Sequence, residues 1–190
     1  QHAFGSLTTE DFLKDLNDSL IGDDKALSDS IDVYAWVYEP GLPANIPPVR
    51  SARFERIDTL LAVWIRTGDT TALRAPAYST SELIYMIRKL PATISPKQMG
   101  ILDDAFGFTE SGNAEIRTAW YTLAIRKDYR KADPHIEAFL TEVGRRKFLM
   151  PLYEALLRQP GGRERARRIY KKARPNYHSV AYHSLDELLK

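Results

Sequence analysis

The feature that most constrains the fold is a series of helix-start signals, each followed by apolar side chains at helical spacing. Ser79 and Glu82 form a capping box, in which the two residues cap each other's backbone N–H groups at a helix start. Ser95 followed by Pro96 is a second start signal, because proline is favoured at the first helical position. Since no stretch alternates apolar and polar residues for long enough to indicate a strand, we expect an all-α protein.

These helix starts recur at a nearly constant interval. The first helices of successive pairs are predicted to begin near residues 81, 113 and 147, a step of roughly 32–34 residues. The residues themselves do not repeat, but the interval is typical of stacked helix pairs. The pattern therefore predicts an α-α superhelix of stacked antiparallel helix pairs, similar to armadillo and HEAT proteins.

A proline-rich segment divides the chain near residue 50. Residues 39–48 contain four prolines, which neither a helix nor a central strand accommodates, so this segment is predicted to be an extended connector. Thr8 and Asp11 predict a capped helix before it. We expect residues 1–50 to supply N-terminal helices and the connector, and residues 51–190 to form the superhelical domain, the two together making one structural unit.

Composition excludes several kinds of site. The chain of 190 residues has no cysteine, which excludes disulfides and thiolate metal sites. It contains no H-E-x-x-H motif and no glycine-rich phosphate loop. His178 and His183 are five residues apart, off the spacing that places two metal ligands on one helical face. Asp103 and Asp104 are adjacent, which favours capping or surface roles over an acid/base pair.

The sequence contains no evident signal for membranes or secretion. No apolar run approaches the ~18 residues of a membrane span, and no signal peptide is recognisable. We expect a soluble protein, with the cytoplasm and the periplasm both left open. Because the chain begins with Gln1 rather than methionine, we also expect a processed product or an excised piece of a longer protein.

Charge is distributed unevenly along the chain. Residues 126–190 carry 16 Lys and Arg against 8 Asp and Glu, whereas residues 1–125 carry 11 against 17. Such asymmetry can mark a nucleic-acid face. However, the predicted helix at residues 163–172 has cations around much of its circumference and no interleaved aromatic side chains, which favours a solvated basic face. We therefore expect no nucleic-acid partner. The tryptophans are expected to pack in the core or between helices; they are Trp36, Trp64 and Trp120.

Three adjacent cations, Arg145, Arg146 and Lys147, stand at the predicted start of a helix whose first turn is expected to contain Pro151. Cations are mildly unfavourable there, by roughly 0.3–1 kcal/mol each, because a helix N-terminus carries partial positive charge. Free backbone N–H groups beside Arg and Lys form a seat for a carboxylate or a phosphate. The pattern alone also allows a solvated basic turn, so both interpretations stay open.

Four motifs, in order along the chain, resemble those of leukotriene A4 hydrolase-type zinc aminopeptidases. Residues 36–43 resemble the W-x-Y-x-P-G-L-P segment of that family, and residues 113–120 its N-x-E-I-R-x-x-W helix. Residues 144–153 resemble the G-R-x-K-F-x-x-P-L-F/Y segment, and residues 177–181 the closing segment. The matches keep their order and spacing over nearly the whole chain. They identify it as similar to the C-terminal helical domain of such an enzyme.

The resemblance implies a role within a larger enzyme that removes N-terminal residues from peptides. In that family a β-rich N-terminal domain and a thermolysin-like catalytic domain, which holds zinc through H-E-x-x-H, precede the helical domain. The resemblance implies that those domains and a peptide substrate are the partners of this chain. It also implies that this chain closes the active-site cleft and, lacking a catalytic centre and metal ligands, is inactive alone.

Site residues follow from the resemblance by position. The Arg and Lys of the family's G-R-x-K motif hold the free carboxylate of the substrate, and they correspond here to Arg145 and Lys147. Arg146 stands where the animal enzymes have methionine, and two interpretations stay open: it points to solvent, or it is an accessory cation of this site. The helical pattern by itself supports a second function equally well: a free-standing helical-repeat scaffold that binds a partner protein in its concave groove.

Overall fold

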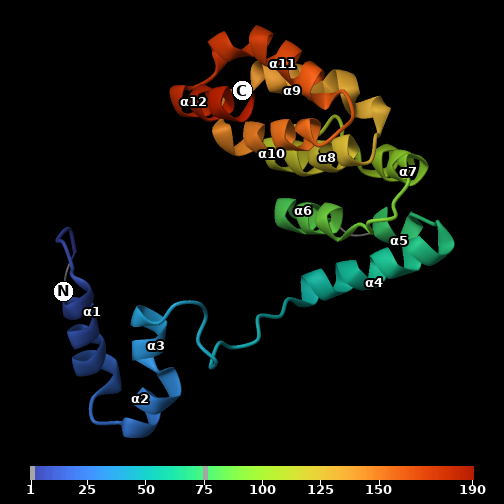
Figure 1. The fold of residues 1–190 in the computed structure, drawn as a ribbon. Coiled ribbons are helices and arrows are strands. Elements are labelled where there is room, and N and C mark those ends of the chain that lie inside the picture. The colour runs from blue at the N-terminus through green and yellow to red at the C-terminus, as the bar shows by residue number, and fades with distance from the viewer. Residues whose placement is uncertain (1–2, 75–76) are drawn as a thin grey trace. The chain divides into compact units, whose positions relative to one another are not determined.

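The computed structural model describes residues 3–74 and 77–190, and its regular elements in those residues are all helices (Figure 1). The all-α prediction is therefore confirmed. The chain divides into two compact units, the N-terminal unit of residues 1–50 and the helical unit of residues 51–190. The prediction that both parts form one structural unit stays a prediction.

The N-terminal unit contains three short α-helices: α1 (Thr9–Leu16), followed directly by the π-helical segment η1 (Asn17–Ile21), then α2 (Lys25–Ile31) and α3 (Val33–Tyr38). The predicted capping box at Thr8 and Asp11 is present at the start of α1. The proline-rich segment was predicted to be an extended connector after these helices, and residues 39–50 indeed contain no helix.

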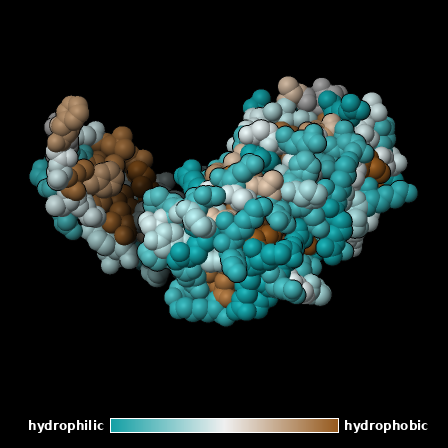
Figure 2. All heavy atoms as spheres, turned by 90° about the horizontal axis from the view of Figure 1, so that it is seen from above, coloured by the Kyte–Doolittle hydropathy of each residue, from teal (hydrophilic) through white to brown (hydrophobic). Residues whose placement is uncertain are grey.

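The N-terminal unit buries little of its apolar surface. Its buried apolar residues are Ile21 and Ala35, whereas Trp36 is 45% exposed. Figure 2 shows hydrophobic side chains gathered on the surface of this unit, while the visible surface of the helical unit is mostly hydrophilic. Trp36 was expected to pack in the core or between helices, but it is exposed in this structure, because α3 is only six residues long and little of the unit packs over it.

The helical unit is a stack of nine α-helices within the described residues: α4 (Ala52–Thr67), α5 (Thr71–Arg74), α6 (Thr80–Lys89), α7 (Pro96–Phe106), α8 (Ala114–Arg126), α9 (Asp133–Glu142), α10 (Arg146–Leu157), α11 (Gly162–Ala173) and α12 (Ser179–Leu188). Two 3-10 turns, η2 (Arg130–Ala132) and η3 (Arg174–Asn176), precede α9 and α12. The predicted capping box at Ser79 is present, and Ser95 caps α7 as predicted, there within a capping box with Gln98.

Alternate helices of this unit form one layer. Helix α6 packs on α4, α8 on α6, α10 on α8 and α12 on α10 (Figure 1). The second helix of each pair lies outside this layer, where α11 packs against both α9 and α10. From α6 onward, the helices of this layer begin at Thr80, Ala114, Arg146 and Ser179, close to the predicted interval, whereas α4 begins at Ala52, 28 residues before α6. The predicted α-α stack of helix pairs is confirmed for this unit.

The core runs through the whole stack, from Ile57 on α4 to Leu189 after α12. Trp64 and Trp120 are almost fully buried, as predicted. Helix α12 was not predicted, although its buried Ala181 and Leu185 have helical spacing. Sequence analysis also missed α5, which is a single turn of four residues.

Candidate carboxylate-binding site

The three predicted cations stand at the N-terminus of α10. Arg145 is the N-cap residue, with extended backbone and no side-chain cap, and Arg146 is the first helical residue. All three side chains, including that of Lys147, are exposed. Pro151 lies well inside the helix rather than in its first turn, so that prediction is wrong. The helix begins five residues before the proline, whose missing N–H leaves one helical hydrogen bond unmade.

The three cations have different neighbours. The Nε atom of Arg146 donates a hydrogen bond of 2.7 Å to Ser184 Oγ on α12. Lys147 Nζ forms an ion pair with Glu115 in the first turn of α8. Within residues 3–74 and 77–190, Arg145 has no ion-pair or hydrogen-bond partner for its side chain, and its guanidinium lies 5.6 Å from the centre of the Phe148 ring. Arg145 is therefore the cation that is free to receive an external anion.

Gly144 sets how closely α10 approaches the segment before α12. Its carbonyl accepts a hydrogen bond of 3.4 Å from the His178 backbone N–H. A Cβ at position 144 would lie 2.9 Å from the backbone oxygen of Asn176, which is closer than non-bonded atoms allow. The glycine of the G-R-x-K motif is thus explained by this contact, which holds the backbone just before Arg145.

Two aromatic side chains pack against each other next to the cations at the start of α10. Phe148 is buried and meets Phe139 of α9 edge-to-face, with ring centres 6.4 Å apart. The Arg117 guanidinium lies 4.8 Å from the centre of the Phe139 ring, and Arg117 Nε is buried without a hydrogen-bond partner. Cations over aromatic faces are attracted by the ring quadrupole. Sequence analysis noted Arg117 only as a motif residue, and its place beside these rings depends on how α8 and α9 pack.

The sequence motifs meet one another in the folded chain. Glu115 of the second motif pairs with Lys147 of the third. Tyr153 of the third motif and Tyr177 of the closing segment are joined by a hydrogen bond of 2.9 Å, and Tyr177 OH donates to the backbone carbonyl of Leu140. Tyr121, Tyr153 and Tyr177 are all buried, so none of them is available to a ligand.

The buried tyrosine pair predicts a loss of stability at high pH. Burial raises the pKa of Tyr177 from 10.0 to about 12 and also raises that of Tyr153. Because the folded state holds the phenol proton more tightly, the stabilisation is complete below pH ~10 and is lost as the pH rises through about 12. Tyr177 accounts for roughly 2–3 kcal/mol of the stabilisation that is lost at high pH. Urea unfolding at pH 8 and pH 11 should show a smaller decrease for Tyr177→Phe than for the unsubstituted chain; equal decreases would contradict this assignment.

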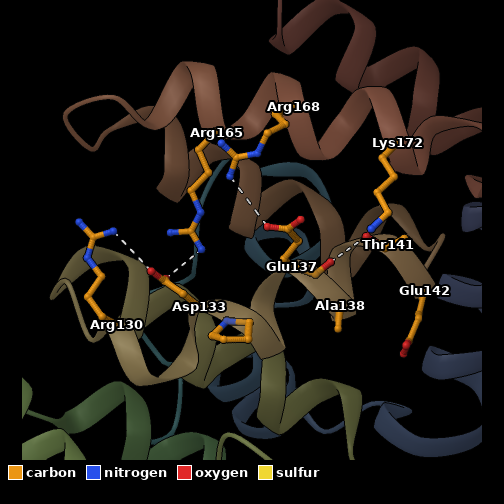
Figure 3. Close-up of a pocket in the computed structure, with 10 residues that line it drawn as sticks. Arg130, Asp133, Glu137, Ala138, Thr141, Glu142, Arg165, Arg168 and Lys172 are labelled. Carbon is orange, nitrogen blue, oxygen red and sulfur yellow. Dashed lines mark hydrogen bonds and ion pairs between the residues drawn. The ribbon is translucent and has the colours of Figure 1, made fainter.

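A second charged feature, the α9–α11 groove, lies between those two helices (Figure 3). Its volume is about 770 Å³. Arg165 is 2.8 Å from Asp133, which Arg130 also approaches to 3.4 Å. Arg168 is 3.9 Å from Glu137. Most cations of this groove therefore face a carboxylate of the same groove, so their charges are compensated and the groove is a poor seat for an external anion.

In the part of the chain that the structure describes, no group of three or more His, Cys, Asp or Glu residues is arranged to hold a metal ion. His178 instead caps α12, where its Nδ1 accepts a hydrogen bond from the Val180 N–H. No helix between residues 3 and 74 or between 77 and 190 combines the length and the apolar character that crossing a bilayer requires.

Comparisons with known proteins agree with the sequence motifs. Leukotriene A-4 hydrolase of Xenopus laevis is 29% identical over 185 residues, which cover 94% of this chain and 30% of the relative. Aminopeptidase B of Mus musculus is 27% identical over 180 residues, which cover 88% of this chain and 27% of the relative. The chain thus spans less than a third of the length of these relatives.

The fold and the family agree with each other. The solved structure of native yeast LTA4 hydrolase superposes with a TM-score of 0.76, covering 97% of this chain and 33% of that one, at 22% identity. This likeness concerns the fold. The family described as "Leukotriene A4 hydrolase, C-terminal" matches residues 78–189, which include α6 to α12 and the cations at the start of α10. The chain belongs to the leukotriene A4 hydrolase C-terminal domain family.

Proposed function

We propose that this chain is the C-terminal helical domain of a zinc aminopeptidase that removes N-terminal residues from peptides. In this proposal the domain closes the active-site cleft and binds the free carboxylate of the substrate through Arg145 and Lys147, with Arg146 as an accessory cation. The zinc ion and the catalytic residues belong to other domains of that enzyme. No residue of this chain takes part in a bond-breaking step.

The observation that carries the proposal is the exposed guanidinium of Arg145 at a helix N-terminus, which has no ion-pair or hydrogen-bond partner among the described residues. Arginine presents a planar fork of donors that matches a carboxylate, whereas lysine acts as a point charge. The first N–H groups of α10 have no helical partners and add to the positive potential. A substrate carboxylate held there would fix the register of the peptide, so that its N-terminal residue reaches the catalytic centre.

The apolar surface of the N-terminal unit supports the proposed partners. Besides Trp36, its exposed apolar side chains include Tyr38, which is 50% exposed, and Leu42, which is 75% exposed. Together they belong to the segment that resembles the family's W-x-Y-x-P-G-L-P motif. A contiguous apolar surface of this kind normally marks an interaction site. We assign it to contact with the catalytic domain of the same enzyme.

Replacing Arg145 by alanine in the full-length enzyme tests the carboxylate role. A charge-assisted hydrogen bond contributes roughly 1.5–3 kcal/mol, so kcat/KM on a tripeptide should decrease about tenfold or more. The same peptide with a C-terminal amide has no carboxylate to lose and should be affected much less. Arg145→Lys keeps the charge but not the planar fork. Its kcat/KM on the tripeptide should therefore lie between those of the unsubstituted enzyme and Arg145→Ala. An equal decrease on acid and amide peptides would exclude the carboxylate role.

A further inference from the structure

One of the two proposed binding cations already has a carboxylate partner within the chain. Lys147 Nζ is paired with Glu115 Oε1, although the two residues are 32 positions apart. Arg145 carries no such partner in the described part of the chain. The two cations are therefore unequal before any substrate arrives: Arg145 is free, whereas Lys147 is partly neutralised.

Glu115 is held in place by its own helix. Its backbone N–H donates a hydrogen bond of 2.9 Å to the side chain of Asn113, the N-cap residue of α8. The Asn113 amide in turn donates a hydrogen bond of 3.2 Å to Thr80 Oγ1 on α6. Helix α8 packs against α10 more extensively than any other pair of helices in the described residues. Glu115 thus approaches Lys147 from a fixed position and, with its side chain 39% exposed, stays accessible.

We propose that Glu115 is a specificity-determining residue of the carboxylate site, acting through Lys147. This inference rests on the proposed function and deepens it. Glu115 holds the Lys147 ammonium beside the start of α10. An incoming substrate carboxylate must compete with the Glu115 carboxylate for this ammonium. The Glu115 carboxylate partly neutralises the ammonium, which weakens the attraction of Lys147 for a carboxylate substrate. The site then binds its anion mainly through Arg145, and releases it more readily than two free cations would.

Glu115→Gln in the full-length enzyme tests the inference. Glutamine has nearly the same shape and can still accept a hydrogen bond from Lys147, but it carries no charge. KM for a tripeptide with a free carboxylate should decrease about threefold, in the range expected for a partly exposed ion pair, with little change in kcat. KM for the C-terminal amide of that peptide should stay the same. The amide reaction also shows whether the variant is folded.

Asp104→Asn is the matched control. Asp104 on α7 pairs with Lys131 at 2.7 Å, and both side chains are exposed, so this variant also removes a carboxylate from a surface lysine. It should leave the ratio of acid to amide KM unchanged. A change as large as that of Glu115→Gln would show that net charge, rather than position, determines binding.

A second background tests whether Glu115 acts through Lys147. In the Lys147→Ala enzyme the ammonium is missing, so Glu115→Gln should lower KM for the acid peptide by clearly less than in the unsubstituted enzyme. An undiminished effect, an increase in KM for the acid peptide, or equal changes on acid and amide would each overturn the inference. The proposed function fails separately, if Arg145→Ala does not distinguish acid from amide. If Arg145→Ala does distinguish them and Glu115→Gln does not, only the role of Glu115 is wrong.

Discussion

Replacing Gly162 by alanine is expected to lower the free energy of unfolding by about 3 kcal/mol or more, which makes it one of the two most damaging changes considered. A Cβ at this position would lie 1.7 Å from the backbone oxygen of Leu156 and 2.8 Å from its carbonyl carbon. Both atoms belong to the last turn of α10, so no side chain can move aside to make room. Overpacking a core typically costs 1–3 kcal/mol, and an overlap with backbone exceeds that case.

The neighbouring Gly161 supplies the control for this prediction. It has a left-handed φ of 70°, and a Cβ there would meet nothing within 4 Å. Gly161→Ala should therefore cost only the conformational strain, roughly 1–2 kcal/mol. Thermal unfolding of both variants should show a clearly larger decrease in Tm for Gly162→Ala. If Gly161→Ala had the larger effect, conformational freedom rather than space would be the reason for this glycine pair.

Asp103→Ala is expected to have an effect of similar size, about 3–5 kcal/mol. Asp103 is buried, and its carboxylate accepts hydrogen bonds from the Thr109 N–H at 2.8 Å, the Thr109 hydroxyl at 2.6 Å and the Tyr129 hydroxyl at 2.9 Å. Trp120 Nε1 donates to the same Thr109 hydroxyl at 3.0 Å. Alanine would leave several buried donors without an acceptor, at roughly 1–3 kcal/mol for each. Urea unfolding at neutral pH measures the loss.

Asp104→Ala is the control for Asp103→Ala. The two residues are adjacent on α7, but the Asp104 side chain is 70% exposed and forms only a surface ion pair with Lys131. Such pairs contribute ~0–1 kcal/mol, so this variant should unfold almost as the unsubstituted chain does. A similar loss from both variants would show that helix α7, and not the buried network, is sensitive to these changes.

Local signals in the sequence predicted much of the fold because helix ends depend on residues close in the chain. The Ser79 capping box and the Ser95 N-cap require only a side chain and a backbone N–H three residues apart, and both formed as predicted. The nearly constant interval between the starts of α6, α8, α10 and α12 follows from such local signals. The same logic placed Arg145, Arg146 and Lys147 at the start of α10.

Predictions that depended on packing were less successful. The sequence assigned Asp103 to a capping or surface role, yet Tyr129 lies 26 residues away and joins it in a buried network. Trp36 was expected to be buried, but the N-terminal unit is too small to cover it. Neither outcome is encoded in neighbouring residues, because burial depends on which segments meet in three dimensions.

An all-helical fold, the start positions of most helices and the three cations at one helix N-terminus could all be predicted from the order of the residues. These properties rest on short-range hydrogen bonds and on the spacing of apolar side chains. The differences among those cations, in contrast, depend on how the helices pack. Arg146 donates a hydrogen bond to Ser184 on α12, and Lys147 forms an ion pair with Glu115 on α8. Arg145 has no such partner among the described residues. The reason is that α10 packs between α8 and α12, and each neighbour engages the cation on its own side.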